Sequence, residues 1–328
     1  MNWAANCYVP PDLTYWQGRA DIPPLSCFFQ AIQLLNLRQP IPASPPLSFA
    51  LLGFCSDEGI KRNLGRQGAI DGPNAIRTVL AKFPVQRLDT RIYDAGDIIY
   101  EDGDLESGQD ALGQAVAQLL KEHVTPIVLG GGHEMAWGHY QGIAKHYPRA
   151  DLGIVNFDAH FDMRPLLPDQ KGSSGTPFLQ IAQAHENSKR RFDYNCIGIQ
   201  RAGNIQSLFD TAKKYHTKFI LADDLQLESQ EKSRDFIDRL LERNQLIYLS
   251  LCLDVFAAAY APGVSAPQAM GVVPWKILPL VRQLAESGKV VSYDVAELSP
   301  AYDKDQRTAK LAAHFIYEIV HRHIPAKG

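Results

Sequence analysis

The sequence predicts one α/β domain, in which a mostly parallel central sheet is flanked by helices in a doubly wound arrangement. Two observations lead to this prediction. From residue 48 onward, short apolar runs alternate with longer segments whose apolar residues recur at helical spacing. Runs such as LGIVNF (152–157) and KFILA (218–222) are almost continuously apolar, which is typical of parallel strands that helices cover on both faces.

The two periodicities locate the elements in order along the chain. Short apolar runs predict strands at 48–54, 91–95, 126–130, 152–158, 194–200, 218–222, 246–253 and 289–295. Helical spacing predicts helices at 72–82, 108–122, 134–146, 204–215, 229–244, 274–287 and 305–323. No linker or repeat divides residues 48–328, so we assign them to one domain. Residues 1–47 are rich in proline and aromatic residues, and we expect an irregular N-terminal extension packed on the domain, with a short helix near SCFFQAIQLLNL (26–37).

Composition limits the classes of function. With 328 residues, 45% of them hydrophobic, the chain is long enough to bury a sizeable core. A net charge of −3 gives no general attraction to nucleic acid or anionic membranes. No apolar run approaches the ~20 residues that cross a bilayer, and the N-terminus lacks the pattern of a signal peptide. The five scattered cysteines form no C-x-x-C pair, so we expect a reduced, cytoplasmic setting.

Three expected strands end at residues with unusual chemistry. PIVLG (126–130) leads into GGHEM, which contains His133. LGIVNF leads into Asp158, His160 and Asp162, and LIYLSL (246–251) leads into Cys252 and Asp254. Alternate residues of an extended segment project to one side, and open parallel sheets bind ligands beyond the carboxyl ends of their strands. We therefore expect these side chains to converge.

A metal centre explains such a convergence. Neighbouring carboxylates strongly disfavour ionising together, and a divalent cation removes that conflict. Carboxylate and imidazole ligands without a thiolate cluster favour a metal such as Mn²⁺ over structural zinc. Five or six ligands exceed one tetrahedral ion, which indicates two metals sharing bridging carboxylates around an activated water. A single histidine is more often a surface or core residue, so the prediction depends on three clusters meeting at one edge.

The clusters GGGHEM (130–135), DAHFD (158–162) and SLCLD (250–254) together resemble the metal motifs of the ureohydrolase family, which includes arginase, agmatinase and formimidoylglutamase. The resemblance covers nearly the whole chain from about residue 48. It implies an arginase-like fold, a binuclear manganese site and a homo-oligomer. The residues that it makes metal ligands are His133, Asp158, His160, Asp162 and Asp254.

Further segments are similar to the formimidoylglutamase branch of this family. They are WQGRAD (16–21), SDEGIKRNLGRQGAIDGPNAIR (56–77), SSGTPF (173–178) and APGVSAP (261–267). Such enzymes hydrolyse N-formimidoyl-L-glutamate to L-glutamate and formamide in histidine degradation. The expected partner is thus a small-molecule substrate, with neither nucleic acid nor membrane.

That substrate carries two carboxylates and one amidine-like group. Arg164 directly follows the second metal motif, and we expect its guanidinium to pair with a substrate carboxylate. Arg62 and Arg66 are further candidates, although an arginine in a loop is more often a solvated surface charge. Glu297 matches the family's acidic position that accepts hydrogen bonds from the substrate's NH groups.

The resemblance also implies a mechanism. We expect metal-activated hydroxide to attack the formimidoyl carbon while Glu297 orients the amidinium. We expect Asp162 to carry a proton to the departing α-amine. Where arginases have a proton-shuttling histidine in an HG segment, this chain has Ser174 and Gly175, so that role is not carried over. His139 is expected to be a helix-face residue and not a ligand.

Cys252 departs from the family pattern S-x-D-x-D, whose first aspartate bridges both metals. A thiolate is a softer ligand that suits zinc or iron better than manganese, and a protonated thiol is a poor ligand. The outcomes left open are two ions with a sulfur ligand, one firmly held ion, an impaired enzyme, or a cysteine that is only a small buried hydrophobe. Because the other five ligand positions and Glu297 are retained, we expect an active enzyme.

Two other functions remain open. One is another amidine or guanidine hydrolase of the same fold, such as an agmatinase or a guanidinoacid hydrolase. Cationic agmatine would be repelled by a pocket that contains Arg164, which separates this alternative from the first. The other is a non-catalytic relative whose metal site is impaired by Cys252.

Overall fold

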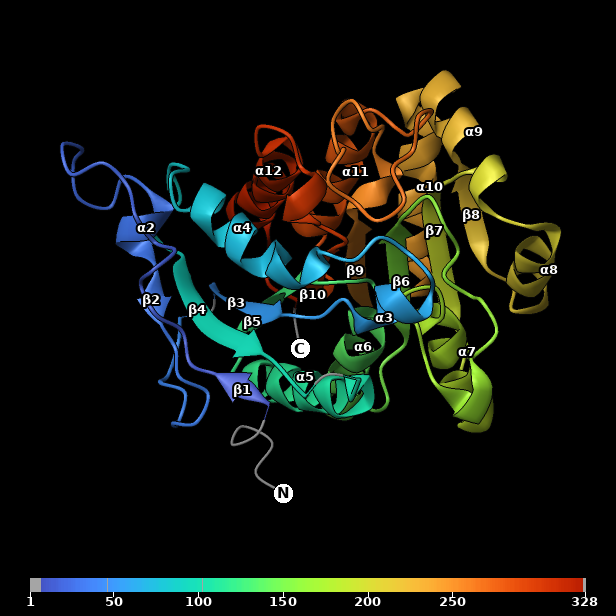
Figure 1. Cartoon of the computed structure of the whole chain (residues 1–328), viewed down its shortest axis with the longest axis horizontal. Helices are drawn as coiled ribbons and strands as arrows, with labels where there is room; N and C mark the ends of the chain where they lie inside the picture. Colours follow the sequence, from blue (N-terminus) through green and yellow to red (C-terminus); the bar gives the residue numbers. More distant parts are fainter. Residues whose placement is uncertain (1–6, 46, 102, 327–328) are drawn as a thin grey trace.

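The computed structural model describes residues 7–45, 47–101 and 103–326, which form a central sheet with helices on both faces (Figure 1). The sheet has ten strands in the order β1-β4-β3-β5-β10-β9-β6-β7-β8, and β2 pairs with β4. Within these ranges, β1 pairs antiparallel with β4, and the other pairings are parallel. The predicted α/β class with a mostly parallel sheet is therefore confirmed.

The eight strands predicted from apolar runs all occur, and seven of them are buried along most of their length. Their bounds are β3 (Ser48–Phe54), β4 (Arg91–Ile98), β5 (Thr125–Gly130), β6 (Leu152–Phe157), β7 (Asp193–Ile199), β8 (Lys218–Leu221), β9 (Leu246–Cys252) and β10 (Val290–Ala296). The largest difference is β4, which continues to Ile98. The exception to this burial is β8, where Lys218 and Phe219 are exposed because the strand lies at the edge of the sheet, so the prediction that helices cover the KFILA run on both faces is wrong.

The seven predicted helices are also confirmed. They are α4 (Gly72–Leu80), α5 (Leu105–Lys121), α6 (Met135–His146), α8 (Gln206–Lys214), α10 (Gln230–Arg243), α11 (Pro274–Glu286) and α12 (Arg307–Arg322). The sequence analysis missed α3 (Glu58–Arg62), α7 (Pro177–Asn187) and α9 (Ala222–Leu227). Short 3₁₀ turns lie at Ala69–Asp71, Pro168–Gln170, Arg201–Gly203, Leu253–Val255 and Pro300–Tyr302. In the described part of the chain, no helix has the length and apolar character that a bilayer span requires.

Alternate strand residues divide the core into two apolar layers. Phe49 and Leu51 of β3 pack in the layer that holds α4, α11 and α12, whereas Ala50 and Leu52 pack in the layer that holds α5, α6 and α7. Figure 1 shows these two groups of helices on opposite sides of the sheet. The helices thus leave the carboxyl ends of the strands to the connecting loops.

The segment before residue 48 contains β1 (Tyr8–Val9), α2 (Phe28–Ala31) and β2 (Gln33–Leu34), with α2 inside the stretch where a short helix was predicted. Trp16 anchors this segment, because its Nε1 donates to Oδ2 of Asp94 at 2.7 Å. Asp94 in turn pairs with the buried guanidinium of Arg77 at 3.0 Å. Residues 1–6 and 46 of the predicted extension lie outside the described residues, and the domain boundary at residue 47 stays a prediction.

Candidate metal centre

Four neighbouring strands bring the candidate ligands to one edge of the sheet. β5, β10, β9 and β6 are consecutive in the strand order. In this register Ala296 lies beside Cys252, and Phe157 lies beside Leu251. The residues that follow each strand therefore leave the sheet at the same level, at the edge where parallel sheets bind ligands.

The glycine run before His133 permits a close approach of two main chains. A Cβ atom at Gly131 would collide with the main-chain oxygen of Ser56, in the loop after β3. The backbone N–H of His133 then donates to Oε1 of Glu297 at 2.9 Å. This bond ties the loop after β5 to the loop after β10.

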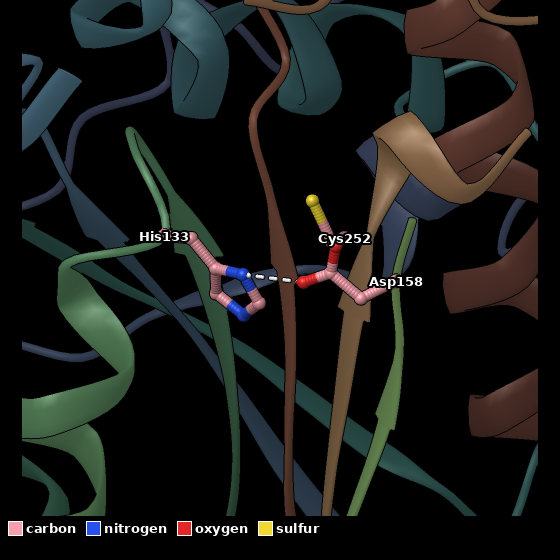
Figure 2. A group of neighbouring side chains, drawn as sticks. All are labelled: His133, Asp158 and Cys252. Atoms are coloured by element: carbon pink, nitrogen blue, oxygen red, sulfur yellow. Dashed lines mark ion pairs between the residues drawn. The ribbon is translucent and has the colours of Figure 1, made fainter. Parts of the chain in front are cut away.

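Two groups of possible metal donors share one carboxylate. Among the described residues, His133, Asp158 and Cys252 form one group, and Asp158, His160 and Asp254 form the other, with the donor atoms of each group within 4.8 Å of one another. Figure 2 shows the first group converging from three different strand ends. Asp158 belongs to both groups, so it is placed to bridge two cations.

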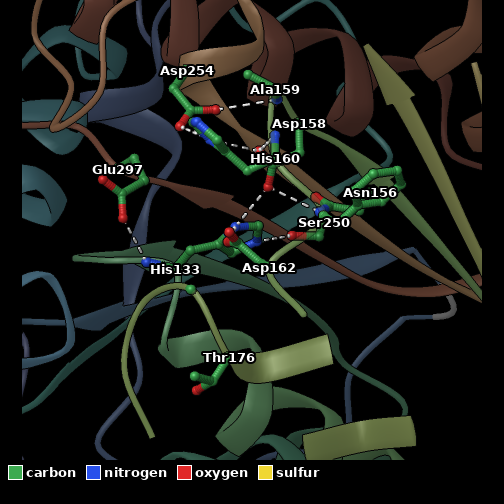
Figure 3. A network of polar contacts seen from close by, with 12 residues as sticks. His133, Asn156, Asp158, Ala159, His160, Asp162, Thr176, Ser250, Asp254 and Glu297 are labelled. Carbon is green, nitrogen blue, oxygen red and sulfur yellow. Dashed lines mark hydrogen bonds and ion pairs between the residues drawn. The ribbon is translucent and has the colours of Figure 1, made fainter. Parts of the chain in front are cut away.

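The distances within the groups agree with this arrangement. Nδ1 of His133 lies 3.0 Å from Oδ2 of Asp158 and 3.0 Å from Oδ2 of Asp162. On the other side, Nδ1 of His160 lies 3.0 Å from Oδ2 of Asp254 and 3.6 Å from Oδ1 of Asp158. Figure 3 shows these contacts together. Asp162 thus joins the group of His133, whereas His160 joins the group of Asp254.

The chemistry of the donors fits divalent cations. Nδ1 of His133 is buried close to two carboxylate oxygens, yet it makes no correctly directed hydrogen bond. The pKa of Asp162 is raised to about 6, because burial and the neighbouring charge of Asp158 raise it more than His133 lowers it. Burial also raises the pKa of Asp254, and the charge of Asp158 adds to that rise. A dication between these groups would give Nδ1 of His133 a partner and would reduce the repulsion between the carboxylates.

Cys252 lies inside the centre and is only 1% exposed. Burial raises the pKa of its thiol well above the usual value, and the charges of Asp158 and Asp254 raise it further. The thiol is therefore protonated in the metal-free protein, and a bound cation would have to displace that proton before the sulfur could serve as a ligand.

Glu297 and Asp162 both have backbone angles that L-residues seldom adopt. Their φ values are +75° and +48°, in the left-handed region, where a non-glycine residue costs about 1–3 kcal/mol. Oε2 of Glu297 is buried without a hydrogen-bond partner. Burial raises the pKa of this carboxyl to about 8, with Asp254 and Glu134 as further causes. A cationic group bound beside Glu297 would favour its ionised form, so this unpartnered acid suits a role in holding such a group.

A cavity of about 190 Å³ opens above the donor groups. This volume suits a ligand of amino-acid size. The residues that line it are Asn63, Gly65, His160, Asp162, Arg164, Ser174, Leu208, Cys252, Asp254, Ser265, Ala266 and Glu297. Arg164 and Glu297 therefore face the same space as the metal donors.

In the structure, Arg62 binds other parts of the protein and does not line the cavity. Its guanidinium donates to Glu106 Oε1 at 2.6 Å, to Glu58 Oε1 at 3.0 Å and to the main-chain oxygen of Gly103 at 2.9 Å. The side chain is 9% exposed and does not line the cavity. These contacts use the donors that substrate binding would need, so the geometry does not support the predicted substrate contact.

Arg66 is likewise occupied by protein groups. Its Nη2 donates to the main-chain oxygen of Val264 at 2.6 Å, and its Nε donates to that of Ser265 at 3.2 Å. Arg66 therefore ties the loop after α3 to the loop after β9, which supplies part of the cavity lining. It acts on the shape of the cavity and not on its charge.

Sequence reasoning did not single out several residues that shape the centre. Asn63, Ser265 and Ala266 line the cavity from segments that were quoted only for their family resemblance. Asn156 helps to position Asp158, because its Nδ2 donates to Oδ2 of Asp158 at 3.0 Å. A polar residue within an otherwise apolar strand was the available signal for Asn156, since such a residue needs a partner.

Comparisons with known proteins agree with this geometry. The sequence model of the arginase family matches residues 47–321. A formimidoylglutamase of Legionella pneumophila (strain Lens) is 46% identical over 95% of this chain and 97% of its own, and one of Clostridium tetani is 39% identical over 95% of each chain. A Trypanosoma cruzi formiminoglutamase structure with Mn²⁺ is 26% identical, with a TM-score of 0.74 over 84% of this chain and 92% of that chain. The family match and the identities over nearly full length leave one conclusion, which is that this chain belongs to the arginase family.

Proposed function

We propose that this protein is a formimidoylglutamase, which hydrolyses N-formimidoyl-L-glutamate to L-glutamate and formamide. The observation that carries this proposal is one cavity with a guanidinium and an unpartnered carboxylate on its walls, beside two groups of metal donors. The side chain of Arg164 is exposed and forms no ion pair among the described residues, so it is available to a ligand. The names of the Legionella and Clostridium relatives support the same function.

The donor groups suit two Mn²⁺ ions, the metal named for the Trypanosoma cruzi protein. His133, Asp158, Asp162 and Cys252 would hold one ion, and Asp158, His160 and Asp254 would hold the other. When bound, such ions supply Lewis acidity, which makes a water molecule nucleophilic near neutral pH. A site with one firmly held ion is the alternative that the thiol of Cys252 leaves open.

The protein's own residues position the substrate and move the proton. Oε2 of Glu297 accepts hydrogen bonds from the NH groups of the formimidoyl end and stabilises its positive charge. The guanidinium of Arg164 binds a carboxylate of the glutamate end. The water oxygen adds to the formimidoyl carbon, the bond from that carbon to the α-nitrogen breaks, and Asp162 delivers a proton to the departing amine. The attacking water is the source of that proton, which Asp162 takes up as the new carbon–oxygen bond forms.

Two further expectations accompany this function. Family resemblance suggests a homo-oligomer, and the small cavity suggests a small-molecule substrate. The assignment to the cytoplasm stays a prediction from the scattered cysteines, all five of which are unpaired in the structure.

A substrate panel tests the proposal. The purified protein is supplied with Mn²⁺ and offered formimidoylglutamate, arginine, agmatine or guanidinobutyrate, and the products are identified by mass spectrometry. We expect formamide and glutamate from the first compound and little urea from the others. Urea released from a guanidine substrate at a higher kcat/KM would overturn the proposal in favour of another hydrolase of this family. Loss of the activity in Glu297→Gln would exclude a contaminating enzyme.

A further inference from the structure

A chain of buried hydrogen bonds runs from the metal centre into the core. Nε2 of His133, the ring nitrogen that points away from the carboxylates, lies 2.8 Å from Oγ of Ser250. Oγ of Ser250 donates to Oδ1 of Asp294 at 2.6 Å. All three side chains are 1% exposed or less. The ring nitrogen of His133 that points away from the metal donors is thus linked through Ser250 to the buried carboxylate of Asp294 in β10.

Asp294 is held at the other end of this chain by two more groups. Oδ2 of Asp294 accepts a hydrogen bond from the hydroxyl of Tyr248, and it lies 2.8 Å from Nδ1 of His139. A carboxylate is an acceptor at both oxygens, so Nδ1 of His139 is the donor. His139 therefore lies on the buried face of α6, and its role is to support Asp294.

These bonds fix where the proton of His133 lies. The hydroxyl of Ser250 has one proton, and that proton is given to Asp294. Toward His133, Oγ of Ser250 can then only accept, so Nε2 of His133 must carry a proton. A neutral imidazole with its proton on Nε2 has its lone pair on Nδ1. Nδ1 is the atom that faces Asp158 and Asp162.

We propose that Ser250 and Asp294 are positioning residues that hold His133 in the tautomer able to bind a metal through Nδ1. This inference rests on the proposed binuclear centre. Neither residue belongs to either donor group, so both act through His133. Outer partners of this kind orient a ligating histidine, and their loss typically weakens metal binding about 10–100-fold.

Ser250 and Asp294 should affect only one of the two metal positions. His133 belongs to the group with Asp158 and Cys252 but not to the group with His160 and Asp254. Loss of Ser250 or Asp294 should therefore weaken one metal position and spare the other. A general loss of stability would weaken both positions together.

The test uses Ser250→Ala and Asp294→Asn in the full chain, with Ser292→Ala as the matched control. Ser292 is buried in the same strand as Asp294, and its Oγ lies 2.6 Å from Nε2 of His139 and donates to the main-chain oxygen of Pro126, whereas the hydrogen bond to His133 comes from Ser250. Mn²⁺ binding is measured by calorimetry and by electron paramagnetic resonance, which distinguishes a coupled pair of ions from an isolated one. Circular dichroism checks that each variant is folded.

We expect wild type and Ser292→Ala to bind two ions per chain and to show the coupled signal. Ser250→Ala and Asp294→Asn should bind one ion with nearly unchanged affinity and the second about 10–100-fold more weakly, and the isolated-ion signal should appear at limiting metal. Two ions bound by Ser250→Ala with wild-type affinities would overturn this inference and leave the proposed function intact. Wild type that binds no Mn²⁺ would overturn both.

Discussion

The guanidinium of Arg66 lies 4.3 Å from the centre of the Tyr302 ring, which places a loop after α3 on a loop after β10. The same guanidinium donates to the main-chain oxygens of Val264 and Ser265. Three loops that surround the cavity are thus joined at one side chain. We propose that this junction keeps the cavity at the size that fits the substrate.

Arg66→Ala is expected to raise KM about tenfold and to lower kcat less, because one wall of the cavity loosens while the metal donors are untouched. Tyr302→Ala should give a change of the same kind, although Tyr302 does not line the cavity. Steady-state kinetics on formimidoylglutamate measures both, with Arg19→Ala as an exposed control. If Arg66→Ala impairs turnover while Tyr302→Ala has no effect, Arg66 contacts the substrate itself.

Arg164 gives a prediction about substrate charge. Arg164→Met removes the guanidinium from the cavity wall and should lower kcat/KM for formimidoylglutamate about 10–100-fold, which is the usual worth of hydrogen bonds between charged groups. The kcat/KM of Arg164→Lys should lie between those of wild type and Arg164→Met, because an ammonium keeps the charge but not the planar pair of donors. Equal activity of wild type and Arg164→Met would contradict the assigned role.

Cys252 gives a prediction about the metal. Cys252→Asp restores the carboxylate of the family motif, so it should bind Mn²⁺ more tightly and Cd²⁺ more weakly than wild type. Metal analysis after dialysis and competition between the two ions measure this preference, and Cys252→Ser provides a variant of similar size. Wild type that neither binds Mn²⁺ nor releases formamide, beside an aspartate variant that does both, would mean that the natural chain is not an active enzyme.

His185 gives a prediction about acid stability that is independent of the metal. Burial lowers the pKa of His185 to about 4, whereas an unfolded histidine titrates near pH ~6.5. Between these values the unfolded chain binds more protons, so stability falls as the pH drops from about 6.5 to about 4. His185→Gln keeps an acceptor for the hydroxyl of Tyr140 but does not titrate. Calorimetry across this range should show wild type losing about 2–5 °C more in Tm than the variant, and parallel curves would contradict the assignment.

Much of the fold was predictable because its elements carry their own signals. The continuous apolar runs marked the buried strands, and α7 was recoverable too, since Phe178, Ile181 and His185 recur at helical spacing after Pro177. The strands β1 and β2 were not recoverable, because each has two residues and exists by pairing with β4. Local sequence holds no information about such a partner.

In the candidate metal centre, too, some residues were predictable from the sequence and others were not. His160 and Asp162 were predicted together because they alternate along one extended segment, and the structure brings them to one cavity. The link from Ser250 to Asp294 joins two strands that are far apart in the chain, so it became visible only with the register of β9 and β10. The sequence offered Arg62 only as a candidate for substrate binding, and it could not show that Glu58 and Glu106 pair with its guanidinium in the fold.

The sulfur atom of Cys252 has a consequence for how this protein is supplied with metal. Affinity for first-row divalent ions rises from manganese toward copper and zinc, and a soft ligand steepens that preference. A cell that expresses this protein with plentiful zinc would therefore load it with a different ion from a cell rich in manganese. The metal found in the isolated protein then depends on the ion supply of the host cell as well as on the binding residues.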